Sequence, residues 1–253
     1  ISEGLGREAV GAIVDGKVLD LRDTLSKDAN VSILTWNDPE GKKVYRHTAS
    51  HVLAQSVKSL FPEVKLGIGP ATDEGFYYDF DKEVPFTAED IEKIEMEMKN
   101  IIKQNLDIER FELSREEAIK LMEDRNEPYK VELINDLPQD AKITFFKQGD
   151  YVDLCAGPHL LNTKPLKAVK LISEGGSSGA YWKGNEKNKM LSRIYGVVFT
   201  KASDLEDYLF RREEARKRDH NKLGRELRIF TTIDMIGQGL PLLMPHGARI
   251  IQS

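Results

Sequence analysis

Two short motifs bring together residue types that bind metals or move protons. His47 and His51 lie four residues apart in a stretch of helical periodicity, so both imidazoles would project from one side of a helix. Cys155 and His159 share that spacing, and Gly157-Pro158 between them favours a chain reversal that turns both side chains toward one point. Three imidazoles and one thiol are a ligand set for a tetrahedral zinc ion.

Each motif also has a plainer interpretation. Two histidines on a helix can be ordinary polar residues, and a lone cysteine is often a small buried side chain. The sequence has five histidines and one cysteine, however, and three of those histidines and the cysteine fall in these motifs. We therefore favour a functional site, in which Asp153 adds a carboxylate two residues before the thiol.

A segment rich in glycine and tyrosine offers further candidates. Gly69 precedes a strand-like run in which Phe76 and Phe80 are expected to be core residues. Side chains alternate along a strand, so Tyr77 and Tyr78 would point to opposite faces. The tyrosine that faces a cleft could orient a water molecule or stack on a nucleic-acid base.

Composition limits the class of protein. With 40% hydrophobic and 31% charged residues, the chain is typical of soluble globular proteins, and no apolar run approaches the ~20 residues of a membrane span. The first residues lack a secretory signal, so we expect a cytoplasmic protein. With a net charge of -5, a nucleic-acid partner would have to be held by a local basic patch.

The elements that must position these residues start with a small β-rich module. Asp15-Gly16, between apolar runs at 10–14 and 18–21, predicts a hairpin, and a β-branched run at 31–36 predicts a third strand. Residues 37–41 predict a turn and a domain boundary.

The fold class expected for residues 38–200 is α+β, with an antiparallel sheet. A capping box at Thr87 and Asp90 starts a helix that ends near Gln104, and Ser114 with Glu117 starts a shorter one. Residues 175–182 are interpreted as a flexible loop, which lacks the Gly-Lys-Ser/Thr ending of a phosphate-binding loop. The other expected elements are a helix at 43–60 and strands at 65–68, 76–80, 142–146, 151–154 and 168–172.

Residues 203–226 are expected to form one charged helix. Basic and acidic residues are interleaved there, which is typical of a solvated connecting helix with internal ion pairs; alternatively, its basic side contacts the phosphates of a nucleic acid. Glycines and prolines, Gly237 and Gly239 among them, punctuate the residues after Thr231, which are too few for a domain. We expect a further domain to follow Ser253.

On these motifs the sequence resembles the threonyl-tRNA synthetase family along essentially its whole length. The two-motif set of histidines and cysteine alone would also fit the alanyl-tRNA editing family, but the flanking strings favour the threonyl enzymes. The strings that carry the resemblance are Arg46–Gln55, Gly75–Asp81, Asp153–His159, Ser178–Trp182 and Lys217–Gly224.

The resemblance implies a modular layout. Residues 1–36 would be the later part of a small ubiquitin-like TGS domain, 37–200 an editing domain, 201–230 a long linker helix and 231–253 the start of a class II catalytic domain. ATP, magnesium and the zinc of that catalytic domain would bind beyond Ser253, so this chain would not make aminoacyl-tRNA by itself. The full-length protein would be a homodimer and the fragment a monomer.

The implied activity is hydrolysis of serine wrongly attached to threonine tRNA. Serine lacks one methyl group of threonine, and binding discriminates one methylene by only ~1–3 kcal/mol. A second site that fits serine and excludes threonine by clash would correct the error at the 3′ end of tRNA(Thr). Such a site needs a positioned water and stabilisation of developing oxyanion charge.

The resemblance also implies roles for individual residues. His47 would hold the terminal ribose hydroxyl, and Lys130 would position the water. Zinc would suit the histidines and cysteine, as in related alanyl editing proteins, but threonyl editing sites are described as working without metal, so we expect no required cofactor. The implied catalytic residues are His47, His51, Lys130, Asp153, Cys155 and His159, and the implied substrate-binding residues are Gly69, Tyr77 and Tyr78, with Asp153, Tyr78 and His51 shaping the serine pocket.

Three other functions remain open. The chain could be a free-standing aminoacyl-tRNA editing hydrolase, or a non-catalytic module that binds zinc or tRNA. A zinc metallohydrolase is disfavoured, because the first motif lacks the glutamate of His-Glu-x-x-His and so has no built-in general base.

Overall fold

The fold comes from a computed structural model that describes residues 2–173, 175–233 and 240–252. Gly237 and Gly239, which the sequence marks as chain punctuation, lie outside the described residues. Backbone contacts divide the chain into two units, Ile1–Ala202 and Ser203–Ser253. The domain boundaries predicted near residues 37 and 231 stay predictions.

The first unit begins with a small antiparallel sheet. β1 (Gly11–Val14) pairs with β2 (Lys17–Leu19) on one side and with β3 (Val31–Leu34) on the other. The Asp-Gly turn between β1 and β2 has φ of 48° and 83°, the left-handed conformation that this hairpin turn requires. The predicted hairpin and third strand are confirmed. A short helix that the sequence does not predict, α1 (Glu3–Glu8), precedes them.

A five-stranded sheet forms the centre of the first unit. Every strand pairing within the described residues is antiparallel, which confirms the predicted α+β class. The central strand of this sheet is absent from the sequence prediction, because its mixed apolar and polar residues alternate only in part. The strands run in the order β10 (Ser178–Tyr181), β11 (Met190–Phe199), β5 (Phe76–Asp81) and β4 (Lys65–Leu66), and β9 (Ala168–Leu171) pairs with the far end of β11.

Two long helices pack on this sheet. α2 (Pro39–Leu60) contacts β5 and β11, and α3 (Ala88–Gln104) packs along α2 and reaches β9. Their apolar faces share one core with the sheet, and the predicted capping box starts α3. The turn predicted at 37–41 is wrong from residue 39 onward, because Pro39 is favoured in the first turn of a helix and α2 begins there.

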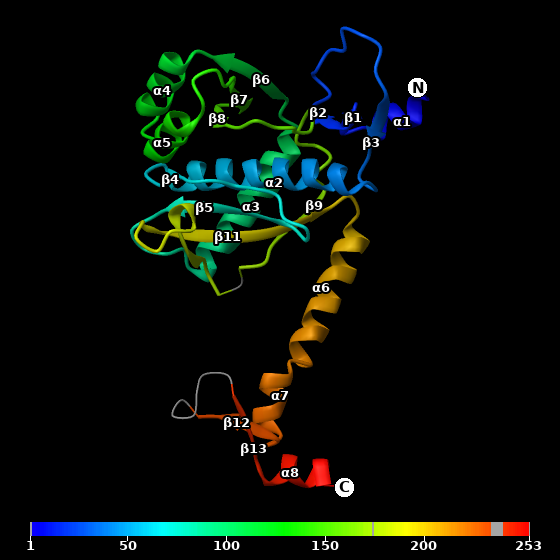
Figure 1. Cartoon of the computed structure of the whole chain (residues 1–253), viewed down its shortest axis with the longest axis vertical. Helices are drawn as coiled ribbons and strands as arrows, with labels where there is room; N and C mark the ends of the chain where they lie inside the picture. Colours follow the sequence, from blue (N-terminus) through cyan, green and yellow to red (C-terminus); the bar gives the residue numbers. More distant parts are fainter. Residues whose placement is uncertain (1, 174, 234–239, 253) are drawn as a thin grey trace. The chain divides into compact units, whose positions relative to one another are not determined.

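A smaller layer lies on the other side of α2 from the five-stranded sheet (Figure 1). There β6, β7 and β8 form a three-stranded sheet that packs with α4 and α5 around a second apolar cluster. The capping box predicted at Ser114 starts α4, whereas the sequence predicts neither β6 nor α5. The bounds are β6 (Ile108–Leu113), α4 (Arg115–Asp124), α5 (Pro128–Asp136), β7 (Ile143–Gln148) and β8 (Tyr151–Leu154).

The glycine-rich segment at 175–182 differs from its prediction. Its residues Ser178–Tyr181 form β10, paired with β11, rather than a flexible loop. The backbone hydrogen bonds of this pairing order a segment whose composition alone favours a loop. A short 3-10 turn, η1 (Trp182–Gly184), follows β10.

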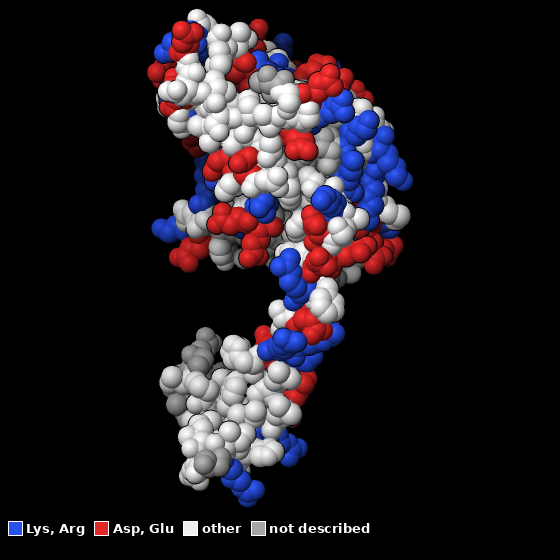
Figure 2. Space-filling model, turned by 90° about the vertical axis from the view of Figure 1, so that its right-hand side faces the viewer, with Lys and Arg blue, Asp and Glu red and all other residues white. Residues whose placement is uncertain are grey.

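In the second unit the predicted single helix is broken in two. α6 (Ala202–Lys217) ends before Asp219, whose side chain accepts the Lys222 N–H at 2.9 Å and so caps α7 (His220–Glu226). Every residue of α6 is described and none is buried. Ion pairs such as Lys217–Glu214 (2.9 Å) join its turns, and Figure 2 shows side chains of both signs close together there. The interpretation as a solvated, internally paired helical segment is confirmed.

A hairpin and a helix complete the described part of the second unit. β12 (Phe230–Thr232) pairs with β13 (Pro241–Leu243), and α8 (Pro245–Gln252) follows. Within the described residues, no helix combines the length and the apolar character needed to cross a bilayer.

Candidate active site

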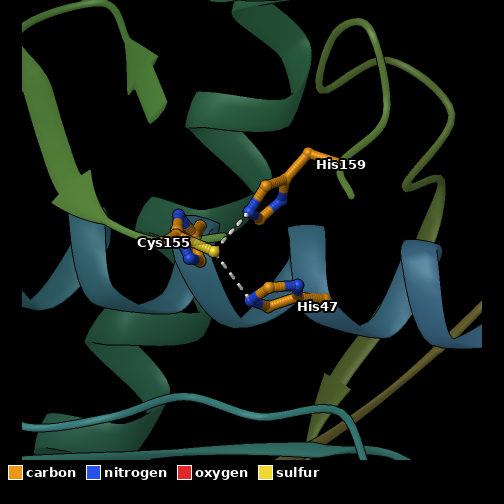
Figure 3. A group of neighbouring side chains, drawn as sticks. His47, Cys155 and His159 are labelled. Atoms are coloured by element: carbon orange, nitrogen blue, oxygen red, sulfur yellow. Dashed lines mark hydrogen bonds between the residues drawn. The ribbon is translucent and has the colours of Figure 1, made fainter. Parts of the chain in front are cut away.

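The two sequence motifs meet in the first unit. Cys155 Sγ lies 3.3 Å from His47 Nε2 and 3.3 Å from His159 Nε2, as Figure 3 shows. The fourth member lies close by, and the ligand atoms of all four side chains are within 4.8 Å of one another. We call these four side chains the His/Cys group: His47, His51, Cys155 and His159.

Helix and turn geometry explain this convergence. His47 and His51 stand one turn apart on α2, with ring centroids 5.1 Å apart. β8 ends just before Cys155, and a turn with φ of 73° at Gly157 brings His159 back to the thiol. A Cβ at position 157 would come within 2.8 Å of the Phe146 ring, so the turn requires glycine both for its φ and for its space.

Thr48 sets the orientation of the His159 imidazole. The Thr48 hydroxyl donates to the Val44 carbonyl at 2.8 Å, so its oxygen is the acceptor for His159 Nδ1 at 3.2 Å. This arrangement assigns the ring N–H to Nδ1 and leaves the Nε2 lone pair facing Cys155. The same oxygen accepts the Leu160 N–H at 3.0 Å, which ties the backbone after His159 to α2.

Burial keeps the His/Cys group uncharged at neutral pH. It lowers the pKa of His47 to about 4 and the pKa of His51 to about 3, and it holds the pKa of His159 well below its usual range. Burial also raises the pKa of the Cys155 thiol to about 12. Neutral imidazoles can accept a hydrogen bond or a proton, and their lone pairs can bind a metal.

A buried ion pair lies next to the His/Cys group. Lys130 Nζ is 2.6 Å from Asp153 Oδ1, with side chains only 3% and 2% exposed. Asp153 Oδ2 accepts hydrogen bonds from Tyr78 OH at 2.7 Å and Tyr151 OH at 2.9 Å, and it lies 3.7 Å from His51 Nε2. Burial opposes ionisation of Asp153, but the positive charge of Lys130 and the hydrogen bond from Tyr78 outweigh it and hold the pKa of the carboxyl below its ordinary value.

The contacts of Lys130 leave it one hydrogen-bond donor. Burial and the Asp153 carboxylate hold the pKa of Tyr78 and of Tyr151 well above the usual value, so both hydroxyls keep their protons. Lys130 Nζ donates to Tyr78 OH at 3.0 Å in addition to its contact with Asp153. Within the described residues, the ammonium makes one hydrogen bond to Tyr78 and an ion pair with Asp153, so with three N–H groups it keeps a donor that can hold a water.

The position of Lys130 depends on how α5 is fixed. Glu127, which directly precedes α5, accepts the Leu66 N–H at 2.7 Å. Tyr129 OH donates to Asp81 Oδ2 at 2.7 Å. These contacts attach the first turn of α5 to β4 and β5, so a short helix that the sequence does not predict determines where the ammonium lies.

The two neighbouring tyrosines point to opposite faces of β5, as the alternation predicts. Tyr78 is fully buried beside the ion pair. Tyr77 lies on the other face, with the guanidinium of Arg193 3.7 Å from its ring centroid, and the structure does not bring it to the His/Cys group. A Cβ at Gly69 would come within 2.1 Å of the Tyr78 ring, so this glycine makes room for the tyrosine.

The His/Cys group fits a zinc ion. A tetrahedral ion with Zn–N near ~2.0–2.1 Å and Zn–S near ~2.3 Å separates its ligands by ~3.5 Å. The two separations of 3.3 Å around Cys155 match that geometry. Thr48 would supply the outer hydrogen bond that orients a metal-bound imidazole, and Cys155 would release its proton because the thiolate is the ligand.

The structure gathers all six residues expected to be catalytic in one region, with Tyr78 and Gly69 beside them. Their roles stay predictions. The sequence motifs do not single out Thr48 or Tyr151, which also contact the site. Tyr151 precedes Asp153 by two positions on a predicted strand, so alternation could have placed both on one face. Thr48 directly follows His47 and is fully buried. Its polar side chain gives no sign of this burial in the sequence.

Comparison with known proteins supports the resemblance. Residues 143–195 match the family described as "Threonyl and Alanyl tRNA synthetase second additional domain". The matched range contains Asp153, Cys155 and His159, whereas Lys130 and α2 lie outside it.

Three bacterial relatives, each named "Threonine--tRNA ligase", extend the likeness to the rest of the chain. The one from Clostridium botulinum is 61% identical over 253 residues, which is 100% of this chain and 39% of the relative. The one from Clostridium perfringens is 62% identical over 253 residues, with the same two shares. The one from Acetivibrio thermocellus is 60% identical over 247 residues, 98% of this chain and 38% of the relative.

The chain therefore spans about two fifths of the length of these curated relatives. Along its whole length the chain is similar to threonine–tRNA ligase, and its residues 143–195 are similar to the second additional domain of the threonyl and alanyl tRNA synthetases.

Proposed function

We propose that this chain carries the editing site of a threonine–tRNA ligase, where serine wrongly esterified to tRNA(Thr) is hydrolysed. The similarity to threonine–tRNA ligases supports the choice of tRNA, and the second additional domain supports an editing role. The observation that carries the chemistry is the buried Lys130–Asp153 pair directly beside the neutral His/Cys group. A cationic donor and neutral acceptors then face one another across a few ångströms.

Lys130 positions the attacking water in this proposal. Its ammonium pairs with Asp153 and donates to Tyr78, and a remaining N–H donates to the water oxygen. Its positive charge also stabilises the oxyanion that forms as the water adds to the ester carbonyl. Asp153 and Tyr78 keep the ammonium in place, and Asp153 with Tyr78 and His51 shapes a pocket for serine.

His47 holds the terminal ribose hydroxyl of the tRNA. It is half-buried, whereas His51 and His159 are buried, so it is the imidazole of the group most accessible to a substrate. Because its pKa is about 4, the ring is neutral near pH 7 and can accept a hydrogen bond from the hydroxyl. A zinc ion held by all four side chains would have a closed tetrahedral shell, which is typical of a structural site, and would supply Lewis-acid chemistry only with one position open. Lys130 offers a cation without it, so we propose that hydrolysis requires no metal.

The same proposal includes the predicted layout. Residues 1–36 belong to a TGS domain, 37–200 to the editing domain, 201–230 to the linker and 231–253 to the start of a catalytic domain. ATP-dependent threonylation resides in the part of the relatives that this chain does not span.

A deacylation assay with serine-charged and threonine-charged tRNA(Thr) tests the function directly. The chain is expected to release serine and to spare threonine, and His47→Ala and Lys130→Ala are each expected to slow serine release by about 100-fold. Lys142→Ala, at an exposed lysine paired with Glu112, is the control. Binding of tRNA without ester cleavage would instead indicate a non-catalytic module, and wild-type rates in both variants would overturn the assigned roles.

A further inference from the structure

A turn of the N-terminal module reaches the candidate site. Residues 20–23 follow β2, and Asp23 N–H donates to the Asp20 carbonyl at 3.0 Å. Asp20 N–H in turn donates to Asp23 Oδ2 at 2.9 Å, which closes the segment on itself. We call it the 20–23 turn. The Asp20 side chain is buried, although its residue type favours the surface.

The Asp20 carboxylate joins this turn to the backbone of His159. Oδ2 accepts the His159 N–H at 3.0 Å. Oδ1 accepts the Arg22 N–H at 2.9 Å and Arg22 Nη1 at 2.8 Å. Both carboxylate oxygens are therefore engaged, one by the histidine segment and one by the arginine.

The Arg22 guanidinium binds the same segment through backbone carbonyls. Nη2 donates to the Leu160 carbonyl at 2.8 Å, and Nη1 lies 3.3 Å from the His159 carbonyl. Nε donates to the carbonyl of Ile108 on β6 at 3.0 Å. A planar guanidinium with five donors can bridge several carbonyls in this way, whereas the point charge of a lysine cannot.

His159 is thus held at three places. The 20–23 turn binds its backbone N–H and carbonyl, and Thr48 binds its ring. The ring nitrogen opposite Thr48 makes the 3.3 Å contact with Cys155. A shift of the backbone by ~1 Å would open this contact, and misplacements of that size can cost ~100-fold in rate.

We infer that Asp20 and Arg22 are positioning residues for ester hydrolysis, through which the N-terminal module sets the geometry of His159. This inference rests on the proposed editing function. On this inference the N-terminal module contributes to the geometry of the hydrolytic site and is not independent of it.

The chain offers a matched control at Arg110. Arg110 Nη2 lies 2.7 Å from Asp23 Oδ1, so this pair also ties the 20–23 turn to β6. The two arginine side chains are similarly buried, 24% exposed for Arg110 and 16% for Arg22. Of these two arginines, Arg22 donates to the His159 carbonyl, whereas Arg110 contacts Asp23.

Deacylation kinetics on serine-charged tRNA(Thr) form the first arm of the test. Arg22→Ala and Asp20→Asn are expected to lower kcat by about 10- to 100-fold with KM changed less than about twofold, because a displaced group acts on the chemical step. Arg22→Lys should recover only part of the rate, and Arg110→Ala should stay within about twofold of wild type. Equal losses in the Arg22→Ala and Arg110→Ala variants would show simple docking of the module and overturn the inference, as would no loss in either.

Alkylation of the one cysteine in the sequence forms the second arm and needs no substrate. Loosening His159 should expose Cys155, so iodoacetamide should react about 5-fold faster or more with Arg22→Ala than with Arg110→Ala. If wild-type protein does not hydrolyse the ester, the proposed function fails, while this labelling contrast still decides the inference. Circular dichroism checks folding, and Asp20→Asn replaces Arg22→Ala if the latter does not fold; identical labelling of the folded variants would contradict the inference.

Discussion

Burial opposes charge in both halves of the candidate site, but only one half stays neutral. In the His/Cys group it removes charge, and the pKa of His51 falls to about 3. In the neighbouring ion pair, Asp153 is equally buried, yet its pKa lies below the ordinary value because Lys130 is 2.6 Å away. Charge at this site is therefore set by the partners of each group rather than by depth. The result is a cationic donor on one side and neutral acceptors on the other.

The largest effect should come from breaking the ion pair. Lys130→Met leaves Asp153 as an unpaired buried charge, so we expect a loss of about 3–5 kcal/mol in the free energy of unfolding and about a 100-fold loss in serine release. Urea unfolding and deacylation measure the two effects.

Lys142→Met is the matched control for this comparison. Lys142 pairs with Glu112 at 3.4 Å on the surface, with side chains 80% and 50% exposed. Removing such a pair should change the free energy of unfolding by less than about 0.5 kcal/mol. Similar losses of unfolding free energy in Lys130→Met and Lys142→Met would contradict this expectation, because the buried pair would then contribute no more to stability than an exposed pair.

The neutral half should appear in the pH dependence of stability. The pKa of His51 is about 3 in the folded chain against 6.5 when unperturbed, so between these values the unfolded chain binds a proton that the folded chain does not. Stability is therefore lost as pH falls below about 6.5, at up to ~1.4 kcal/mol per pH unit for one proton.

His51→Gln removes this proton uptake. The slope of the free energy of unfolding between about pH 6 and about pH 5 should become shallower by ~1 kcal/mol per pH unit, as measured by urea unfolding across a pH series. An unaltered slope in His51→Gln would contradict a buried neutral imidazole.

A smaller effect is expected from the tyrosines of β5. Tyr78→Phe removes the hydrogen bonds to Asp153 and from Lys130, and the serine release rate should fall about 10-fold. Tyr77→Phe should have the smaller effect, because that ring lies on the opposite face of the strand. Equal effects would place Tyr77 in the site, as the sequence alone allows.

The metal tests separate what the His/Cys group can bind from what hydrolysis needs. Cobalt(II) added to the protein should give thiolate-to-metal absorption that Cys155→Ser lacks, with release of the thiol proton. A chelator should leave serine release unchanged, because Lys130 supplies the cation. Loss of activity in chelator, restored by zinc, would show that the metal is required.

Spacing and local capping could be predicted from the sequence because they depend on neighbouring residues. The four-residue spacing of His47 and His51 places both on one side of α2, and the capping boxes at Thr87 and Ser114 start α3 and α4 as predicted. The meeting of the two motifs also followed from composition, since few other residues could supply that ligand set.

The remaining features depend on tertiary contacts that local patterns do not encode. α5 is short, and no side-chain cap starts it. Its start is fixed instead by the hydrogen bond from the Leu66 N–H of β4 to the Glu127 carboxylate. β10 is ordered by pairing with β11, which overrides the loop-forming composition of 178–181. The link from Asp20 to His159 joins residues 139 positions apart, a separation over which sequence patterns give no register.

The most direct test is a crystal structure with a non-hydrolysable seryl ester analogue of the terminal adenosine. We expect the ribose hydroxyl to lie within hydrogen-bond distance of His47 and the ester carbonyl to lie beside Lys130, between the charged and the neutral halves of the site. An analogue bound elsewhere, on the Tyr77 face of the sheet or on the second unit, would contradict this placement.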